Sequence, residues 1–257
     1  MRCMTTRLYC RKNQRVTLSV LVHGRAFAVC GYAAEEKPSQ NDEGERMIEL
    51  SHWPYIQTIS LSGDYKTDIT NFLTVNGKQD TASHCISVAK TSEEIAVRFG
   101  VDKSMASASA LLHDISNVVK PQDMLDYAIK CNWEIDASER KYPFILHQRL
   151  SADFARELFG ITDPLILSAI RCHSTLKENP SAHDMVLFLA DKLSWDQDGT
   201  PPFYDAISSA LERSLAHASL AYINFVLDNG MILSPHRWLL DAKKWLENQS
   251  DFLSVPS

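Results

Sequence analysis

The sequence contains several side chains that can bind metal ions, and the adjacent pair His113-Asp114 is the most distinctive of them. The pair places an imidazole beside a hard carboxylate, directly after an apolar run. Because neighbouring residues on an α-helix point about 100° apart, both side chains can reach one metal ion only where a helix ends. Turn-forming Ser and Asn residues and the helix-breaking Pro121 follow the pair. The sequence therefore predicts a helix end at His113-Asp114.

Four further residues complete a candidate set of metal ligands, namely His84, His147, His173 and Asp191. Each occurs in an apolar, helix-like context. Asp191 is expected in the last turn of a helix, where a carboxylate opposes the helix dipole and therefore calls for a nearby cation. Lone histidines are usually not ligands, so we expect structural or surface roles for the other five: His23, His52, His183, His217 and His236.

The whole set offers four imidazoles and two carboxylates, which is enough for two metal ions with one bridging carboxylate. Two metal ions about 3.5–4 Å apart are the usual means of activating water against a phosphorus centre. The mixture of nitrogen and oxygen donors favours iron, with manganese as the alternative. No cysteine pair competes for a structural zinc ion.

Composition narrows the class of protein. The 257 residues include 32 acidic and 26 basic side chains, a net charge of −6, and this argues against a nucleic-acid-binding protein. No apolar run is long enough to span a membrane. The six cysteines include no CxxC pair and are interpreted as reduced thiols, which favours a cytoplasmic protein.

We expect three parts along the chain. Residues 1–46 are predicted to be a poorly ordered extension, because a charged, polar stretch at 35–45 offers nothing to bury. This extension can also lie upstream of a natural start at Met47, and a cleaved signal peptide is a further alternative. Residues 47–79 form a lead-in segment, and residues 80–250 form the main domain.

Helical spacing of apolar residues dominates the main domain, and no strand with clean alternation is found. The dipeptides Asp163-Pro164 and Asn179-Pro180 are typical helix starts. The fold class predicted is an all-α helical bundle. The expected helices are at about 80–99, 102–112, 122–131, 147–159, 164–173, 180–191, 204–228 and 235–249.

The order His, His-Asp, His, His and Asp resembles that of the HD-domain metal-dependent phosphohydrolases. Local strings such as Leu111-Leu112-His113-Asp114-Ile115 and Phe188-Leu189-Ala190-Asp191-Lys192 are similar to those of the YqeK family, over roughly residues 64–250. The resemblance implies an HD-domain helical bundle, a di-iron centre and possible assembly as a homodimer. It also implies symmetrical hydrolysis of diadenosine tetraphosphate to two ADP by a metal-activated hydroxide.

The same resemblance implies the role of each candidate ligand. Carried over by position, one metal ion is held by His84, His113, Asp114 and Asp191. The second is held by His147 and His173, with Asp114 bridging the two ions as the central catalytic residue.

The chain departs from the family where polyphosphate should be held. Asn117 and Met185 stand where the family has lysines, which leaves Arg171 and Lys177 as the expected substrate-binding cations. Aromatic residues after the last ligand can stack a nucleobase, namely Trp195, Phe203 and Tyr204. Two alternatives stay open: an HD hydrolase of another nucleotide or small phosphoester, and a catalytically silent metal- or nucleotide-binding regulatory protein.

Overall fold

The computed structural model describes residues 17–22, 25–30, 50–195, 197 and 199–252, and it divides into two compact units at Glu45 and Arg46. The first unit contains a hairpin of two antiparallel strands, β1 (Thr17–Val22) and β2 (Arg25–Cys30). We predicted no strands in this region, although these segments contain Val and Phe, which favour β-structure. The rest of the predicted extension 1–46 lies outside the described residues, and the proposed division at 46 and 79 stays a prediction.

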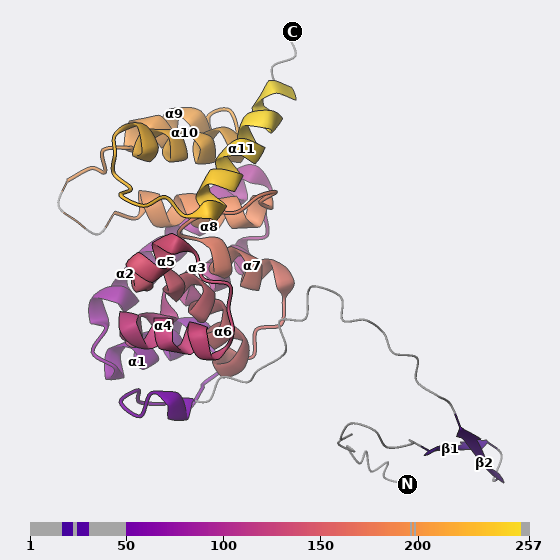
Figure 1. The fold of residues 1–257 in the computed structure, drawn as a ribbon. Coiled ribbons are helices and arrows are strands. Elements are labelled where there is room, and N and C mark those ends of the chain that lie inside the picture. Colours follow the sequence, from indigo (N-terminus) through magenta and orange to yellow (C-terminus); the bar gives the residue numbers. More distant parts are fainter. Residues whose placement is uncertain (1–16, 23–24, 31–49, 196, 198, 253–257) are drawn as a thin grey trace. The chain divides into compact units, whose positions relative to one another are not determined.

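The second unit is built from helices, as the sequence predicts, and confirms the all-α fold class (Figure 1). Its described helices are α1 (Tyr65–Val75), α2 (Gln79–Phe99), α3 (Lys103–Leu112), α4 (Pro121–Lys130), α5 (Ala137–Lys141), α6 (His147–Phe159), α7 (Pro164–Cys172), α8 (Ala182–Leu193), α9 (Tyr204–Leu211), α10 (Leu215–Asp228) and α11 (Arg237–Phe252). There are also three short 3₁₀ turns: η1 (Leu50–His52) before α1, η2 (Ile115–Val118) between α3 and α4, and η3 (Pro143–Leu146) between α5 and α6.

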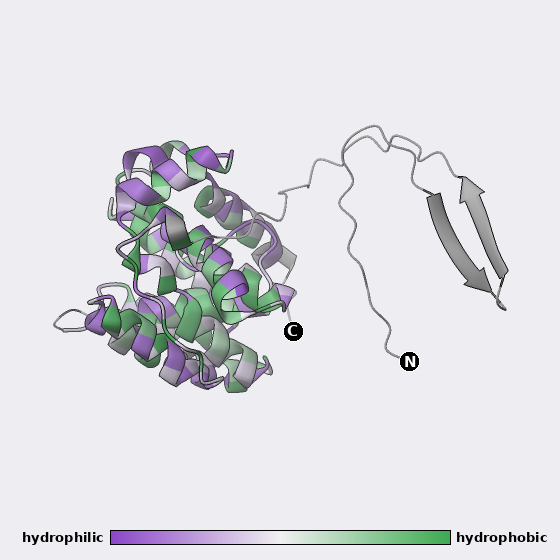
Figure 2. Ribbon diagram, turned by 90° about the horizontal axis from the view of Figure 1, so that it is seen from below, coloured by the Kyte–Doolittle hydropathy of each residue, from purple (hydrophilic) through white to green (hydrophobic). Residues whose placement is uncertain are grey.

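Helix α8 lies at the centre of this unit. Every residue from His183 to Ala190 is buried, as expected of a helix surrounded by other elements. Helices α2, α7 and α10 pack against it. Most other helices carry both hydrophilic and hydrophobic residues along their length, which is typical of helices that bury one face (Figure 2).

Side-chain caps fix several helix starts. Asp163 accepts hydrogen bonds from the backbone N–H groups of Leu165 and Ile166, so α7 begins where predicted. Helix α8 begins two residues later than the Asn179-Pro180 signal indicates. Ser181 and Asp184 form a reciprocal capping box there, which satisfies backbone N–H groups of the first turn.

The predicted single helix at 204–228 is wrong, because the chain forms two helices there. Ser214 has an extended backbone (φ −171°, ψ 167°), and its side chain accepts a hydrogen bond from the N–H of His217. It therefore ends one helix and caps the next. Within the described residues, none of the helices is both long and apolar enough to cross a membrane.

Candidate metal centre

The six candidate ligands are delivered by four helices and the turn after α3. His113 is the C-cap residue directly after α3, and Asp114 precedes η2, so the predicted helix end occurs at this pair. The other ligands lie in the second turn of α2 (His84), at the first position of α6 (His147), at the end of α7 (His173) and in the last turn of α8 (Asp191).

The structure brings these side chains together in two overlapping groups. One group contains His84, His113 and Asp114, and the other contains Asp114, His147 and His173. Within each group the potential ligand atoms lie within 4.8 Å of one another. Asp191 joins the first group, because its Oδ1 lies 3.0 Å from Nε2 of His84 and 3.7 Å from Nε2 of His113.

The two oxygens of Asp114 face different groups. Its Oδ1 lies 3.3 Å from Nε2 of His147 and 3.5 Å from Nε2 of His173. Its Oδ2 lies 3.6 Å from Nε2 of His113. A carboxylate in this position can therefore bridge two cations.

Backbone carbonyls set the tautomer of three of the imidazoles. In His113, His147 and His173, Nδ1 lies 2.6, 2.6 and 2.8 Å from the carbonyl oxygen three residues earlier. Because a carbonyl oxygen can only accept a hydrogen bond, each Nδ1 carries the hydrogen. The lone pair of each neutral ring is then on Nε2, which points into the centre of the site.

Several buried atoms of the site have no hydrogen-bond partner among the described residues. They include Oδ1 of Asp114, an acceptor, and Nε2 of His113, which is an acceptor when the ring is neutral. Buried polar groups without partners are costly and uncommon. Bound cations satisfy such acceptors, so the residues present fit the metal ions that the sequence predicts.

The electrostatics of the site also suit cations. Burial raises the pKa of Asp114, but the charge of His113 and hydrogen bonds from His147 and His173 together hold that pKa well below its usual range. Burial likewise raises the pKa of Asp191, but the ammonium of Lys192 together with His113 and His84 holds that pKa well below its usual range. Both carboxylates are therefore ionised at neutral pH.

The imidazoles differ in their protonation. Burial lowers the pKa of His173 to about 4, which leaves a neutral ring able to bind metal. Burial also disfavours the charged form of His113, but Asp114, Cys85 and Asp191 together raise its pKa well above the ordinary value. A metal ion at His113 must therefore displace a proton, and its binding is coupled to pH.

Two cavities adjoin the ligands. One of about 700 Å³ is lined by His84, Asp114, Asn117, Phe144 and Trp195, among others. A smaller cavity of about 360 Å³ contains His84 and Asp191, and its other lining residues include Lys192, Trp195, Phe203 and Tyr222. His84 and Trp195 line both cavities, so ligands in either one lie beside the same metal-binding side chains.

The structure places the two predicted substrate-binding cations elsewhere. Arg171 donates a hydrogen bond to Asp153 at 3.0 Å. Lys177 donates to Ser168 at 2.6 Å and lies 3.3 Å from a carboxylate oxygen of Asp184. Arg171 and Lys177 line a third cavity, of about 820 Å³, which contains none of the six candidate ligands. Their role in substrate binding stays a prediction that this geometry does not support.

Aromatic residues beside the site are only partly those expected. Trp195 and Phe203 line the cavities, but Tyr204 lines neither of them. Phe144 was not anticipated: its ring stacks on His147 with centroids 4.5 Å apart, and the residue is 48% exposed. Its position three residues before a ligand was the one available signal, because the same turn supplies the carbonyl that His147 bonds.

The histidines outside the set have other contacts. His183 bonds Ser109 at 2.8 Å, His217 bonds Ser214 at 2.7 Å, and His236 lies 3.5 Å from Glu139. His52 lies on the surface at 2.6 Å from the ammonium of Lys130. His23 lies outside the described residues.

Comparison with known proteins identifies related sequences. A family profile described as "HD domain" matches residues 81–196, which include all six candidate ligands. A protein of Lactococcus lactis subsp. cremoris, described as an uncharacterized protein in the pepC 5′ region, is 46% identical over 149 residues, covering 58% of this chain and 76% of that protein.

More distant relatives carry a described activity. A symmetrical bis(5′-nucleosyl)-tetraphosphatase of Halalkalibacterium halodurans is 30% identical over 42% of this chain and 57% of that protein. The protein of the same description from Bacillus subtilis is 24% identical over 65% of this chain and 89% of that protein.

One solved structure shares the fold. It is described as a predicted HD superfamily hydrolase involved in NAD metabolism from Clostridium acetobutylicum. It aligns with a TM-score of 0.63 at 22% identity, covering 75% of this chain and all of that one.

Proposed function

Because the chain belongs to the HD-domain family of phosphohydrolases, we propose that it hydrolyses a dinucleoside polyphosphate, with diadenosine tetraphosphate cleaved at its central anhydride to two ADP. The observation that carries the proposal is the position of Asp114, whose two oxygens face two separate groups of ligands. The described activity of the more distant relatives supports this choice of substrate.

We assign one metal ion to His84, His113, Asp114 and Asp191, and a second to Asp114, His147 and His173. Iron is the expected metal and manganese the alternative, because the site mixes imidazole and carboxylate donors. When bound, the two ions supply an activated water nucleophile at neutral pH and neutralise charge on the phosphoryl oxygens.

The chain's own residues hold this centre in position. Backbone carbonyls fix three imidazoles with Nε2 directed inward. The ammonium of Lys192 donates to Oδ2 of Asp191 at 2.5 Å and to the carbonyl of His173 at 3.3 Å. It therefore leaves Oδ1 of Asp191 facing His84 and His113.

The cavity of about 700 Å³ has the size typical of sites for small organic ligands. Phe144 and Trp195 give it two aromatic walls, and such side chains stack on nucleobases. In this arrangement a base contacts an aromatic ring while its phosphates extend toward Asp114.

A direct test is product analysis by HPLC after incubation of the metal-loaded protein with diadenosine tetraphosphate. ADP as the sole nucleotide product supports the proposal. ATP and AMP in equal amounts would indicate attack on a different anhydride and contradict the symmetrical reaction. The Asp191→Asn variant is the control for catalysis by a contaminating enzyme, because it should lose the product.

One observation favours a smaller phosphoester as the second candidate substrate. Of the described residues that line the two cavities at the metal centre, Lys192 is the one Lys or Arg, and it is already paired with Asp191. A tetraphosphate needs more positive charge than this. Hydrolysis of nucleoside monophosphates with the tetraphosphate left intact would support that candidate, and metal binding without any hydrolysis would support a regulatory protein.

A further inference from the structure

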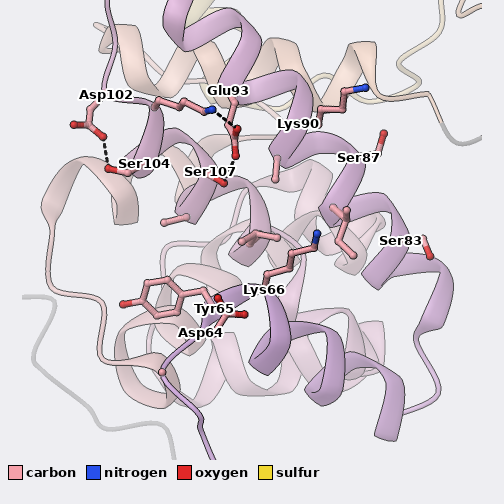
Figure 3. Close-up of a pocket in the computed structure, with 16 residues that line it drawn as sticks. Asp64, Tyr65, Lys66, Ser83, Ser87, Lys90, Glu93, Asp102, Ser104 and Ser107 are labelled. Atoms are coloured by element: carbon pink, nitrogen blue, oxygen red, sulfur yellow. Dashed lines mark hydrogen bonds and ion pairs between the residues drawn. The ribbon is translucent and has the colours of Figure 1, made fainter.

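A larger cavity adjoins the metal centre along α2. It has a volume of about 1100 Å³ and is lined by residues of α1, α2 and α3 and the segments that precede α1 and α3 (Figure 3). Ser83 and Ser87 line both this cavity and the 700 Å³ cavity that contains His84 and Asp114. The two spaces therefore meet at these two serines.

A polar stripe on α2 leads from one space into the other. Ser83, Ser87 and Lys90 are spaced four and three residues apart, so they lie on one face of the helix (Figure 3). His84 lies beside the start of this stripe. At 1.5 Å per residue, Lys90 is about 9 Å along the helix axis from His84.

The acidic residues around the cavity are already engaged. Asp64 and Asp102 each cap a helix by accepting a hydrogen bond from a backbone N–H group. Glu93 accepts a hydrogen bond from Ser107 and forms an ion pair with Lys103 at 2.9 Å. Their charges are therefore largely satisfied by helix ends and by Lys103, with a weaker contribution from the charge of Lys66.

Two lysines of the cavity remain without such partners. Among the described residues, neither Lys66 nor Lys90 has a hydrogen bond or an ion pair with a side chain. Figure 3 shows the ammonium of Lys66 pointing into the cavity. These lysines can supply the positive charge that the metal-centre cavities lack.

The rest of the cavity wall is suited to a nucleoside. Apolar side chains line it, among them Ile86, Ala108 and Leu111. Tyr65 contributes an aromatic ring and is 38% exposed. A base can pack on these apolar and aromatic surfaces while the lysines pair with phosphate oxygens.

We propose that this cavity binds one nucleoside-phosphate arm of a dinucleoside polyphosphate whose central anhydride lies at the metal centre. The other arm occupies the aromatic cavity beside Phe144 and Trp195. This inference rests on the proposed function and adds the location of the second arm. It assigns Lys66 and Lys90 to the binding of phosphate.

The test is steady-state kinetics with diadenosine tetraphosphate for the double variant Lys66→Met/Lys90→Met. Because the double variant loses charged hydrogen bonds to phosphate, we expect KM to rise roughly 10-fold or more. We expect kcat to change less than about threefold. The control is Lys141→Met/Lys244→Met, which removes the same charge at exposed positions outside these cavities and should retain the wild-type KM.

A second measurement separates this inference from the proposed function. Equilibrium dialysis of ADP against the metal-loaded protein should give two ADP per chain for the wild type and one for the double variant. Wild-type cleavage of the tetraphosphate, with KM and ADP stoichiometry unchanged in the double variant, would overturn the inference alone. No cleavage by the wild type would overturn the proposed function, and the inference with it.

Discussion

The Nε2 atoms of His147 and His173 lie 3.0 Å apart, although the Nδ1 of each ring already donates its hydrogen to a carbonyl oxygen. Two acceptor lone pairs repel each other at this distance unless a cation or a proton lies between them. Burial lowers the pKa of His173 to about 4, which disfavours a proton on that ring at neutral pH. A metal ion that accepts both lone pairs would account for the arrangement.

Replacement of Asp114 should remove both metal ions, because its oxygens face both groups of ligands. We expect elemental analysis to find about two metal ions per chain in the wild type and fewer than one in Asp114→Asn. Hydrolytic activity should fall by about 100-fold or more, since even residues that only support a ligand cost 10–100-fold. His183→Gln is the matched control, because His183 lies outside the site and should be replaceable without metal loss. Full metal content in Asp114→Asn would contradict the bridging role.

Removal of the metals should destabilise the fold. A ligand present at 100 times its dissociation constant stabilises a protein by about 2.7 kcal/mol. For a chain of this size, chelation should therefore lower the melting temperature by about 5–10 °C. Differential scanning fluorimetry with and without chelator measures the shift, and Asp114→Asn should show little of it. An unchanged wild-type melting temperature after verified metal removal would argue against a buried metal centre.

The sequence is enough to gather the six candidate ligands because the donor types and the His113-Asp114 pair are local features. The fold class follows from helical periodicity for the same reason. The positions of the expected substrate-binding cations, in contrast, do not follow from local sequence features. Arg171 was expected to bind substrate as one of the cations that remain where the family's lysines are missing. It precedes His173 by two residues, however, and two residues turn a helix by about 200°. Arg171 therefore points away from His173 and pairs with Asp153.

Residues from short connections were also beyond the reach of sequence patterns. Phe144 belongs to a 3₁₀ turn whose direction depends on packing against α4 and α6. Apart from its position three residues before His147, nothing in its sequence neighbourhood separates it from a core aromatic residue. Lys66 and Lys90 are 24 positions apart in the chain, and only the packing of α1 against α2 places them around one cavity.

The stacking role of Phe144 can be tested by Phe144→Leu, which keeps an apolar side chain but removes the ring. Loss of stacking on a base costs about 1–3 kcal/mol, which corresponds to an increase in KM of roughly 5- to 150-fold. Metal content should stay at the wild-type value, because Phe144 supplies its backbone carbonyl to His147 and not its side chain. Tyr204→Leu is the control, since Tyr204 is similarly exposed, at 42%, and lines neither cavity at the metal centre. Equal effects of the two substitutions would contradict the assignment.

The contribution of His183 to the pH dependence of stability can be measured separately. Burial lowers its pKa below the ordinary value of 6.5, which outweighs the opposite effect of Asp184, Asp163 and Asp102. Ser109 donates its hydroxyl hydrogen to the carbonyl of Met105, so the neutral ring of His183 donates Nε2–H to Ser109. Protonation of the ring keeps the hydrogen bond that Nε2–H donates to Ser109, but it places a positive charge in a buried position.

The sign follows from proton linkage. Below about pH 6.5 the unfolded chain binds a proton at His183 that the folded chain does not, so the stabilising contribution is present above that pH and is lost as the pH falls. We expect His183→Gln to be less stable than the wild type by about 1 kcal/mol at pH 7.5, because the hydrogen bond to Ser109 is weakened. The deficit should shrink at pH 5.5, since glutamine does not titrate. The free energy of unfolding can be measured by urea denaturation of wild type and variant in the presence of chelator. Both proteins share the metal ligands, so the contribution of those residues cancels in the difference. A deficit that grows as the pH falls would mean that His183 is charged in the folded protein.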